Sequence, residues 1–220
     1  IDCHDPHQAG PPAGGGPDDP NHLRACVGCH PLYQDPKAAA RHAGHPVDAK
    51  VSCLDCHMPR IVQGFTGYNR SHRISSPSEP EILATGMPNA CNLCHLEKSL
   101  AWTRNTLESG WGAHVELAPS LTPLFGADYE RPAGPAWLRH PSSMVRTVAA
   151  GAYARSSQGP ASLPELAGHL EEPNAYVRMR FLLAMERILG RRISDEEYSL
   201  TGDRALRRAQ TRDLRGRLPT

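Results

Sequence analysis

The stretch Cys91-Asn92-Leu93-Cys94-His95 has the same spacing of cysteine and histidine as two earlier stretches, 26–30 and 53–57. In all three, two residues separate the cysteines and a histidine follows the second cysteine directly. Cys3 is also followed by a histidine, His4, so residues 1–4 have the form of the last four residues of a fourth such motif. We therefore expect the first cysteine of that motif directly upstream of residue 1.

A cysteine pair at this spacing with an adjacent histidine is the attachment signal for c-type haem. Two thiols about one helical turn apart can each bond to a vinyl group on the same porphyrin edge, and the histidine then binds the iron from below. The sequence therefore predicts four c-type haems, one of them with its first cysteine upstream of residue 1. The expected thioether cysteines are Cys3, Cys26, Cys29, Cys53, Cys56, Cys91 and Cys94, and the expected proximal iron ligands are His4, His30, His57 and His95.

Other uses of paired cysteines explain the pattern less well. Two such pairs can hold a structural zinc ion, but zinc does not require a histidine directly after the second cysteine. A disulfide framework is typical of irregular spacings and an even number of cysteines, whereas this chain has seven. A thioredoxin-like redox site needs alternating strands and helices, which the pattern lacks.

The composition also indicates that cofactors fill part of the interior. Hydrophobic residues make up 39% of the 220 residues and aromatic residues 5%, and the chain contains 19 Gly and 21 Pro. Such a chain has difficulty building an apolar core throughout. The motifs follow one another too closely for each haem to have a globular pocket of its own. We therefore expect haems that lie close together, an arrangement that favours electron transfer.

Iron ligated by two histidines needs a second imidazole on the opposite face of each haem. We expect these distal ligands among the histidines of the same half, which are His22, His42, His45 and His72, with His7 in reserve. A solvent-exposed histidine is the alternative at each of these positions. In the second half, we expect His114, His140 and His169 to be surface residues.

The second half contains an internal repeat. The stretches 140–146 (HPSSMVR) and 172–178 (EPNAYVR) align at an offset of 32 residues. A fixed period with proline at a helix start and an apolar stripe after it indicates helix pairs stacked as a repeat, and this pattern resembles HEAT-type repeats. A small bundle of antiparallel helices is the alternative. We also expect helices over 36–45, about 92–109, and 163–170 with Pro164 in the first turn.

The predicted fold is mainly α with much irregular structure. It consists of a haem-packed cytochrome domain over residues 1–110 and a HEAT-like helical repeat domain over residues 111–220.

Three segments resemble those of multihaem c-type cytochromes. Residues 41–46 (RHAGHP) with 52–59 (SCLDCHMP) resemble the cytochrome c-554 and nitrite-reductase-related group, and 69–74 (NRSHRI) is similar to the element that supplies a distal histidine there. Residues 87–95, followed by Lys98, Ser99 and Trp102, resemble the last haem site of bacterial multihaem proteins that continue into helical repeats. The resemblance implies bis-histidine haems in stacked and angled pairs, and an extracytoplasmic location. The lysine-ligated active haem of the nitrite reductases is missing, so their activity does not carry over.

These patterns predict an electron-transfer protein, periplasmic or extracellular, whose helical half docks it to a redox partner, to other multihaem cytochromes or to copies of itself. The alternatives are a subunit or fragment of a multihaem oxidoreductase and a protomer of an extracellular cytochrome filament. We find no set of catalytic residues. The net charge of +1 without a basic stripe argues against nucleic acid, and no apolar run approaches the length of a transmembrane helix.

Overall fold

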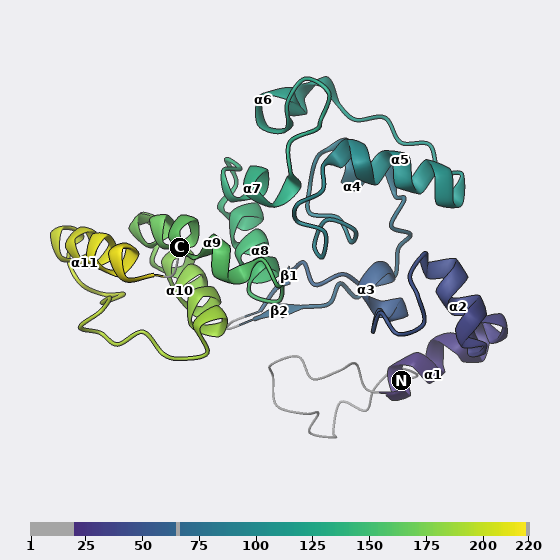
Figure 1. The fold of residues 1–220 in the computed structure, drawn as a ribbon, viewed down its shortest axis with the longest axis horizontal. Coiled ribbons are helices and arrows are strands. Elements are labelled where there is room, and N and C mark those ends of the chain that lie inside the picture. Colours follow the sequence, from purple (N-terminus) through teal and green to yellow (C-terminus); the bar gives the residue numbers. More distant parts are fainter. Residues whose placement is uncertain (1–19, 65–66, 219–220) are drawn as a thin grey trace.

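The computed structural model of the protein describes residues 20–64 and 67–218. Within them the chain is mainly helical with one short antiparallel pair of strands, which confirms the predicted mainly α fold class. Figure 1 shows α1 to α3 at one end of the molecule and α8 to α11 at the other. The elements are α1 (Pro20–Cys29), η1 (Pro31–Gln34), α2 (Pro36–Ala43), α3 (Cys53–His57), β1 (Val62–Gln63), β2 (Tyr68–Asn69), α4 (Pro80–Ala84), α5 (Leu100–Trp111), η2 (Pro119–Leu121), α6 (Thr122–Phe125), α7 (Ala133–Leu138), α8 (Ser143–Tyr153), α9 (Gly159–Gly168), η3 (His169–Glu171), α10 (Ala175–Leu189) and α11 (Arg204–Arg217).

The α2 helix starts and stops where its sequence directs. The Asp35 side chain accepts a hydrogen bond from the Lys37 amide at 3.1 Å, which caps the first turn, and Pro36 occupies a position where a missing N–H costs nothing. Gly44 adopts a left-handed conformation with φ of 67° and ends the helix. The expected helix over 36–45 therefore exists and ends two residues early.

The helix expected from about Asn92 begins only at Leu100, so that prediction was wrong at its N-terminal end. Ser99 caps α5 by accepting a hydrogen bond from the Trp102 amide at 3.0 Å. The residues before it form turns, because the Asn92 amide group donates to the carbonyls of His95 and Lys98 at 3.3 and 3.0 Å. A side chain that satisfies these carbonyls replaces the helical hydrogen bonds that a helix would have made there.

Asn92 is fully buried and ties the third motif to α5. Its side-chain oxygen accepts hydrogen bonds from Asn89 at 2.9 Å and from the Thr103 hydroxyl at 2.6 Å. The asparagine between the two cysteines of this motif is therefore a structural anchor. A buried network of this kind stabilises the fold only when all its members are paired.

The main hydrophobic core extends across residue 110. Leu96 and Leu100, beside the third motif, share one buried cluster with Phe125 and Trp137 and with the helices that follow. The Trp137 indole donates to the Gly86 carbonyl at 2.8 Å, which adds a polar link between the two parts of the chain. The third motif is thus packed against the helical half, and the predicted division into domains at residue 110 stays a prediction.

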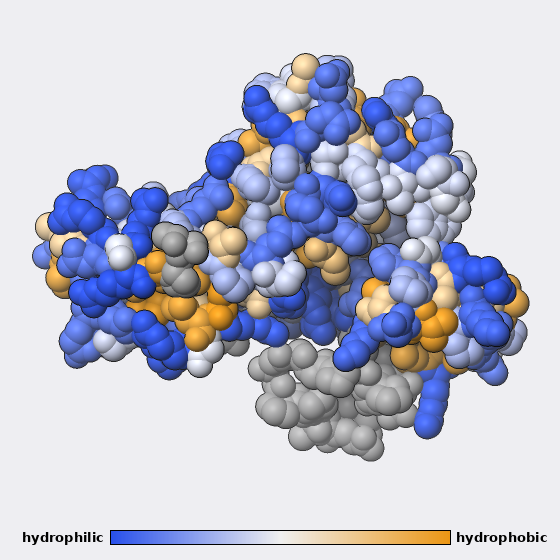
Figure 2. Space-filling model, viewed as in Figure 1, coloured by the Kyte–Doolittle hydropathy of each residue, from blue (hydrophilic) through white to orange (hydrophobic). Residues whose placement is uncertain are grey.

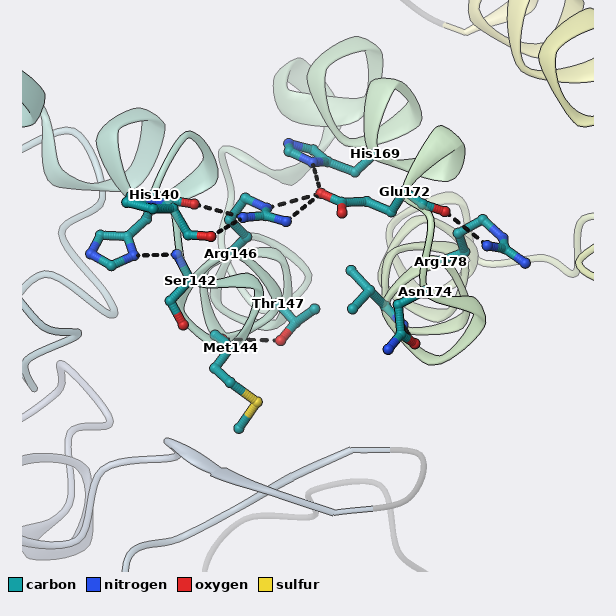
Figure 3. A network of polar contacts seen from close by, with 11 residues as sticks. His140, Ser142, Met144, Arg146, Thr147, His169, Glu172, Asn174 and Arg178 are labelled. Atoms are coloured by element: carbon teal, nitrogen blue, oxygen red, sulfur yellow. Dashed lines mark hydrogen bonds and ion pairs between the residues drawn. The ribbon is translucent and has the colours of Figure 1, made fainter. Parts of the chain in front are cut away.

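The sequence repeat of the second half is also visible in its hydrogen bonds. Arg146 Nη1 donates to the carbonyls of His140 and Pro141, just before α8, at 2.7 and 2.8 Å. Arg178, 32 residues later, donates to the two equivalent carbonyls before α10, those of Glu172 and Pro173, both at 2.8 Å. Figure 3 shows the bond to Glu172. Each arginine donates to backbone carbonyls just before the N-terminus of its own helix. The two helices, α8 and α10, pack against each other.

Two expectations about this half were wrong. His169 is largely buried: its ring stacks on Phe181 with centroids 4.3 Å apart, and its Nδ1 lies 3.3 Å from Glu172, which also binds Arg146 (Figure 3). The helix expected over 163–170 begins at Gly159, so Pro164 lies inside α9. Pro160 occupies the first turn that had been expected for Pro164.

Replacing Asn92 with alanine should destabilise the protein by about 2–4 kcal/mol, because it leaves buried donors and carbonyls without partners. Urea unfolding followed by circular dichroism measures the loss. Asn105→Ala is the control, since Asn105 is exposed, and should cost no more than about 0.5 kcal/mol. Equal losses for the two variants would contradict the anchoring role of Asn92.

Candidate haem-attachment sites

The three complete motifs all lie on single helical turns. α1 ends at Cys29, and the His30 amide donates to the Cys26 carbonyl at 3.0 Å. The third motif repeats this bond, from the His95 amide to the Cys91 carbonyl at 2.9 Å, and α3 consists of the second motif alone. A helical turn brings thiols three residues apart to the same side of the backbone, as attachment to one porphyrin edge requires.

The six cysteines in the described part of the chain are free thiols. Within the same residues there is no group of three or more His, Cys, Asp or Glu side chains arranged to hold one metal ion. Cys3, His4 and His7 lie outside the described residues. His22 belongs to α1, but its side chain is also outside the description.

Two of the predicted distal histidines face two of the predicted proximal ones. The rings of His42 and His57 have centroids 6.1 Å apart and planes 1° from parallel, and those of His45 and His95 lie 6.0 Å apart at 24°. A metal–imidazole bond is about 2 Å long, so one metal ion between two opposed imidazoles separates their centroids by roughly 6 Å. Both pairs therefore fit an iron ion bound between them.

In one ring of each pair, a backbone carbonyl determines which nitrogen is free. His57 Nδ1–H donates to the Ser75 carbonyl at 2.9 Å, and His45 Nδ1–H donates to the Ala43 carbonyl at 2.7 Å. A hydrogen bond at Nδ1 fixes the tautomer and leaves Nε2 as the nitrogen that can bind a metal. An ordinary aromatic pair would not require this arrangement, whereas histidine ligands of metals almost always have it.

The other ring of each pair, His42 or His95, also has a polar neighbour at Nδ1, at a longer distance. His42 Nδ1 lies 3.4 Å from the Tyr33 hydroxyl, and these two rings stack with centroids 4.6 Å apart. His95 Nδ1 lies 3.9 Å from a Glu97 carboxylate oxygen. All four histidines therefore have a partner on the Nδ1 side.

Trp111, at the end of α5, holds the segment that carries His42 and His45. Its indole donates to the His42 carbonyl at 2.8 Å, and a Cβ atom at Gly44 would lie only 2.9 Å from its ring. Gly44 is therefore required twice, for its left-handed backbone and for the close approach of the tryptophan. The turn at Gly44 directs the imidazoles on either side of it to different motifs.

Arg70 holds the second motif in place. Its guanidinium donates to the carbonyls of Leu54 and Met58 at 2.7 and 3.2 Å and to the Asp55 carboxylate at 2.8 Å. Burial raises the pKa of the Asp55 carboxyl, but hydrogen bonds from Ser52 and the ion pair with Arg70 outweigh it, and the pKa is lowered. One arginine thus links β2 to the start and the end of α3.

The motifs are neighbours in space. His42 and His45, only three residues apart, face the second and the third motif, so these two motifs lie close together. Burial, followed by the charges of Cys91, Asp55 and Cys94, accordingly raises the pKa of the Cys56 thiol to about 11. The Tyr33 ring lies 6.4 Å from His30 and 4.6 Å from His42, and so joins the first motif to the ligand that faces the second.

The described ring contacts bring together four of the predicted ligands, His42 with His57 and His45 with His95. His72 is exposed. Tyr33, Arg70 and Trp111 were not recognised as parts of the site from sequence. Tyr33 follows His30 by about one helical turn, a spacing that could have indicated it, whereas Trp111 lies far away in the sequence.

A cysteine pair on a helical turn, beside a histidine that faces a second histidine, is the arrangement expected where c-type haem is attached. Residues 30–117 match the family model of cytochrome c552. This segment contains the second and third motifs together with His30, His42, His45 and His72. The match supports a c-type cytochrome of the nitrite reductase group with c-type haem as its cofactor. It covers less than half of the chain, and no curated protein or solved structure matches.

Replacing Arg70 with methionine should destabilise the protein by about 1–3 kcal/mol, because two carbonyls and a partly exposed carboxylate lose their donor. Because the pKa of Asp55 is lowered in the folded state, this loss should be complete above pH about 4 and should shrink as the pH falls further. Unfolding by urea at several pH values measures both effects.

Arg73→Met is the matched control, because Arg73 also pairs with a carboxylate, Glu79, but its side chain is 70% exposed. It should cost less than about 1 kcal/mol. A loss in Arg70→Met that is as small as in this control would contradict the role of Arg70.

Proposed function

We propose that the protein transfers electrons through closely spaced, covalently attached c-type haems with two histidine ligands each. The observation that carries the proposal is the pair of opposed, nearly parallel imidazoles at each of two attachment motifs, with centroids 6.1 and 6.0 Å apart. When bound, haem iron supplies the one-electron redox chemistry, and the chain positions and insulates it.

The geometry favours a specific pairing of ligands. The haem attached at Cys53 and Cys56 would be ligated by His57 and His42, and the haem at Cys91 and Cys94 by His95 and His45. The end of α2 then supplies the distal ligand of two successive haems from residues three positions apart. For the first motif and for the fourth, at Cys3 and His4, we propose ligands from His22, His72 and His7, which gives four haems in all.

The surface around the motifs is suited to a flat apolar cofactor. Leu32, Val47 and Ile74 are 68%, 62% and 71% exposed, although each is a large apolar residue. Figure 2 shows apolar side chains on the surface around α1 to α3. Porphyrin faces would cover such side chains, which explains how a segment with so few buried residues is stabilised.

An oxidoreductase subunit is the second candidate function, because the family match lies in the nitrite reductase group. A catalytic iron needs an open coordination position for its substrate. Two opposed histidines would take up both coordination positions that the porphyrin leaves, so the second and third motifs favour electron transfer over catalysis. Any catalytic iron would therefore belong to the first or the fourth motif.

We further propose that the helical half is a HEAT-like module that docks the haem-bearing half to a partner. The repeated hydrogen bonds of Arg146 and Arg178 support a repeat unit of 32 residues. A cytochrome requires redox partners, and other multihaem cytochromes or further copies of this chain are suitable ones. We propose a periplasmic or extracellular location, because c-type haem is attached outside the cytoplasm. Each helix of the described residues is too short or too polar to cross a bilayer.

Intact mass after expression with a haem-attachment system should show one haem increment for each complete motif and a fourth where the upstream cysteine is present. The double variant Cys91→Ala/Cys94→Ala should lose one increment. The matched control is Cys91→Ser, which keeps one thioether and should keep the haem. A mass equal to that of the bare chain would contradict the proposed function.

Replacing His42 or His45 with alanine should convert one haem each from low spin to high spin, because each variant removes one axial ligand. Electron paramagnetic resonance and absorption spectra report the change, and the opened haem should bind cyanide. His114→Ala, whose side chain is 77% exposed, is the control and should leave the spectrum unchanged. Fully low-spin spectra in both variants would contradict the pairing.

A further inference from the structure

The Tyr33 side chain lies between histidines that belong to two different haem sites. Its ring centroid is 6.4 Å from that of His30, with the planes at 34°, and 4.6 Å from that of His42, with the planes at 28°. His42 in turn faces His57 at 6.1 Å. A row of aromatic rings therefore leads from the histidine of the first motif to the histidine pair at the second.

The backbone fixes this tyrosine from both sides. The Tyr33 amide donates to the His30 carbonyl at 3.1 Å and closes the turn of η1, and residues three apart in such a turn lie on the same side of it. Asp35 then caps α2, which packs against η1 and returns His42 to the tyrosine. The Tyr33 hydroxyl lies 3.4 Å from His42 Nδ1, and the side chain is half-buried.

These ring contacts limit how far apart the first two irons would be. An iron bound to an imidazole nitrogen lies about 3 Å from the ring centroid, since the metal–nitrogen bond is about 2 Å long. Adding the two ring separations to these two bonds gives an upper limit of about 17 Å between irons bound to His30 and His42. The path along the rings is therefore short.

Tyr33 is placed differently from another aromatic residue beside a motif. The Trp102 ring lies 5.1 Å from His95, but among the described ring contacts it reaches no second histidine. Tyr33 contacts a histidine ring on each side. Electron tunnelling weakens steeply with distance, and it weakens less through the π orbitals of neighbouring rings than through water or aliphatic side chains. A ring in this position shortens the gaps that an electron has to cross.

We propose that Tyr33 is a bridging residue for electron transfer between the haem attached at Cys26 and Cys29 and the haem attached at Cys53 and Cys56. The inference rests on the proposed function. One electron passes from the reduced iron of one haem to the oxidised iron of the other. No bond forms or breaks, and the tyrosine keeps its proton and its electrons throughout.

The test uses the full haem-loaded chain and its variants Tyr33→Phe and Tyr33→Leu. Tyr176→Leu is the matched control, because Tyr176 is also half-buried and its hydroxyl also has a polar partner, the Gly64 carbonyl at 3.1 Å. Intact mass establishes that each variant carries the same number of haems as the wild type. Electron paramagnetic resonance and a redox titration then compare the spin states and the reduction potentials.

Pulse radiolysis adds single electrons to the oxidised protein, and absorbance follows their redistribution among the haems. The double variant Cys26→Ala/Cys29→Ala, which lacks the first haem, identifies the phase that depends on that haem. In Tyr33→Leu this phase should slow at least about tenfold at unchanged potentials, because the ring contacts on both sides are lost. In Tyr33→Phe, which keeps the ring, and in Tyr176→Leu the rate should stay within about twofold of the wild type.

The inference is overturned if this phase is as fast in Tyr33→Leu as in Tyr176→Leu. Equal slowing in Tyr33→Phe and Tyr33→Leu would also overturn it, because the hydroxyl and not the ring would then carry the effect. A high-spin haem in Tyr33→Leu would make Tyr33 a positioning residue for His42 and would overturn the bridge as well. A wild-type chain without haem, or with haem that is not low spin, would instead contradict the proposed function.

Discussion

The structure depends on how two imidazoles, three residues apart, are directed to two different attachment motifs. His42 and His45 leave α2 on either side of Gly44, whose left-handed backbone turns the chain between them. Trp111 closes this turn from the far side by holding the His42 carbonyl and packing on the glycine. The Trp111 contacts and the helical turns that carry His57 and His95 together set the distances between the facing rings. A change at Trp111 would therefore affect both proposed haem sites.

Hydrogen bonds from buried polar side chains hold the backbone of the second and third motifs in place. Arg70 holds the second motif through two carbonyls and a carboxylate, and Asn92 holds the third through two carbonyls and a buried network. These interactions fix the backbone at both motifs. The exposed apolar side chains nearby then remain available to a cofactor. The helical half has the opposite organisation, with a continuous core of leucines, alanines and aromatic residues that reaches the third motif.

Much of the site could be predicted from the sequence because the chemistry of attachment is local. Cysteines two residues apart and the next histidine lie on one helical turn wherever the turn is placed, so the six described cysteines and His30, His57 and His95 needed no fold. The capping residues of α2 and the repeated helix entries before α8 and α10 are local in the same sense. The predicted start of α5 was wrong because the Asn92 side chain donates to backbone carbonyls that would otherwise accept helical hydrogen bonds. The sequence pattern does not show which of these two hydrogen-bond arrangements forms.

The sequence by itself determined the mainly helical character and indicated c-type haem and its expected attachment residues, because each depends on neighbours within a few positions. Only the tertiary structure decided which imidazole faces which, and that Trp111 and Arg70 belong to the site. These relations join residues 12 to 69 positions apart, from Arg70 and Met58 to His42 and Trp111, and no local pattern encodes them. They depend on how the helices pack, and that packing is decided by the whole buried core.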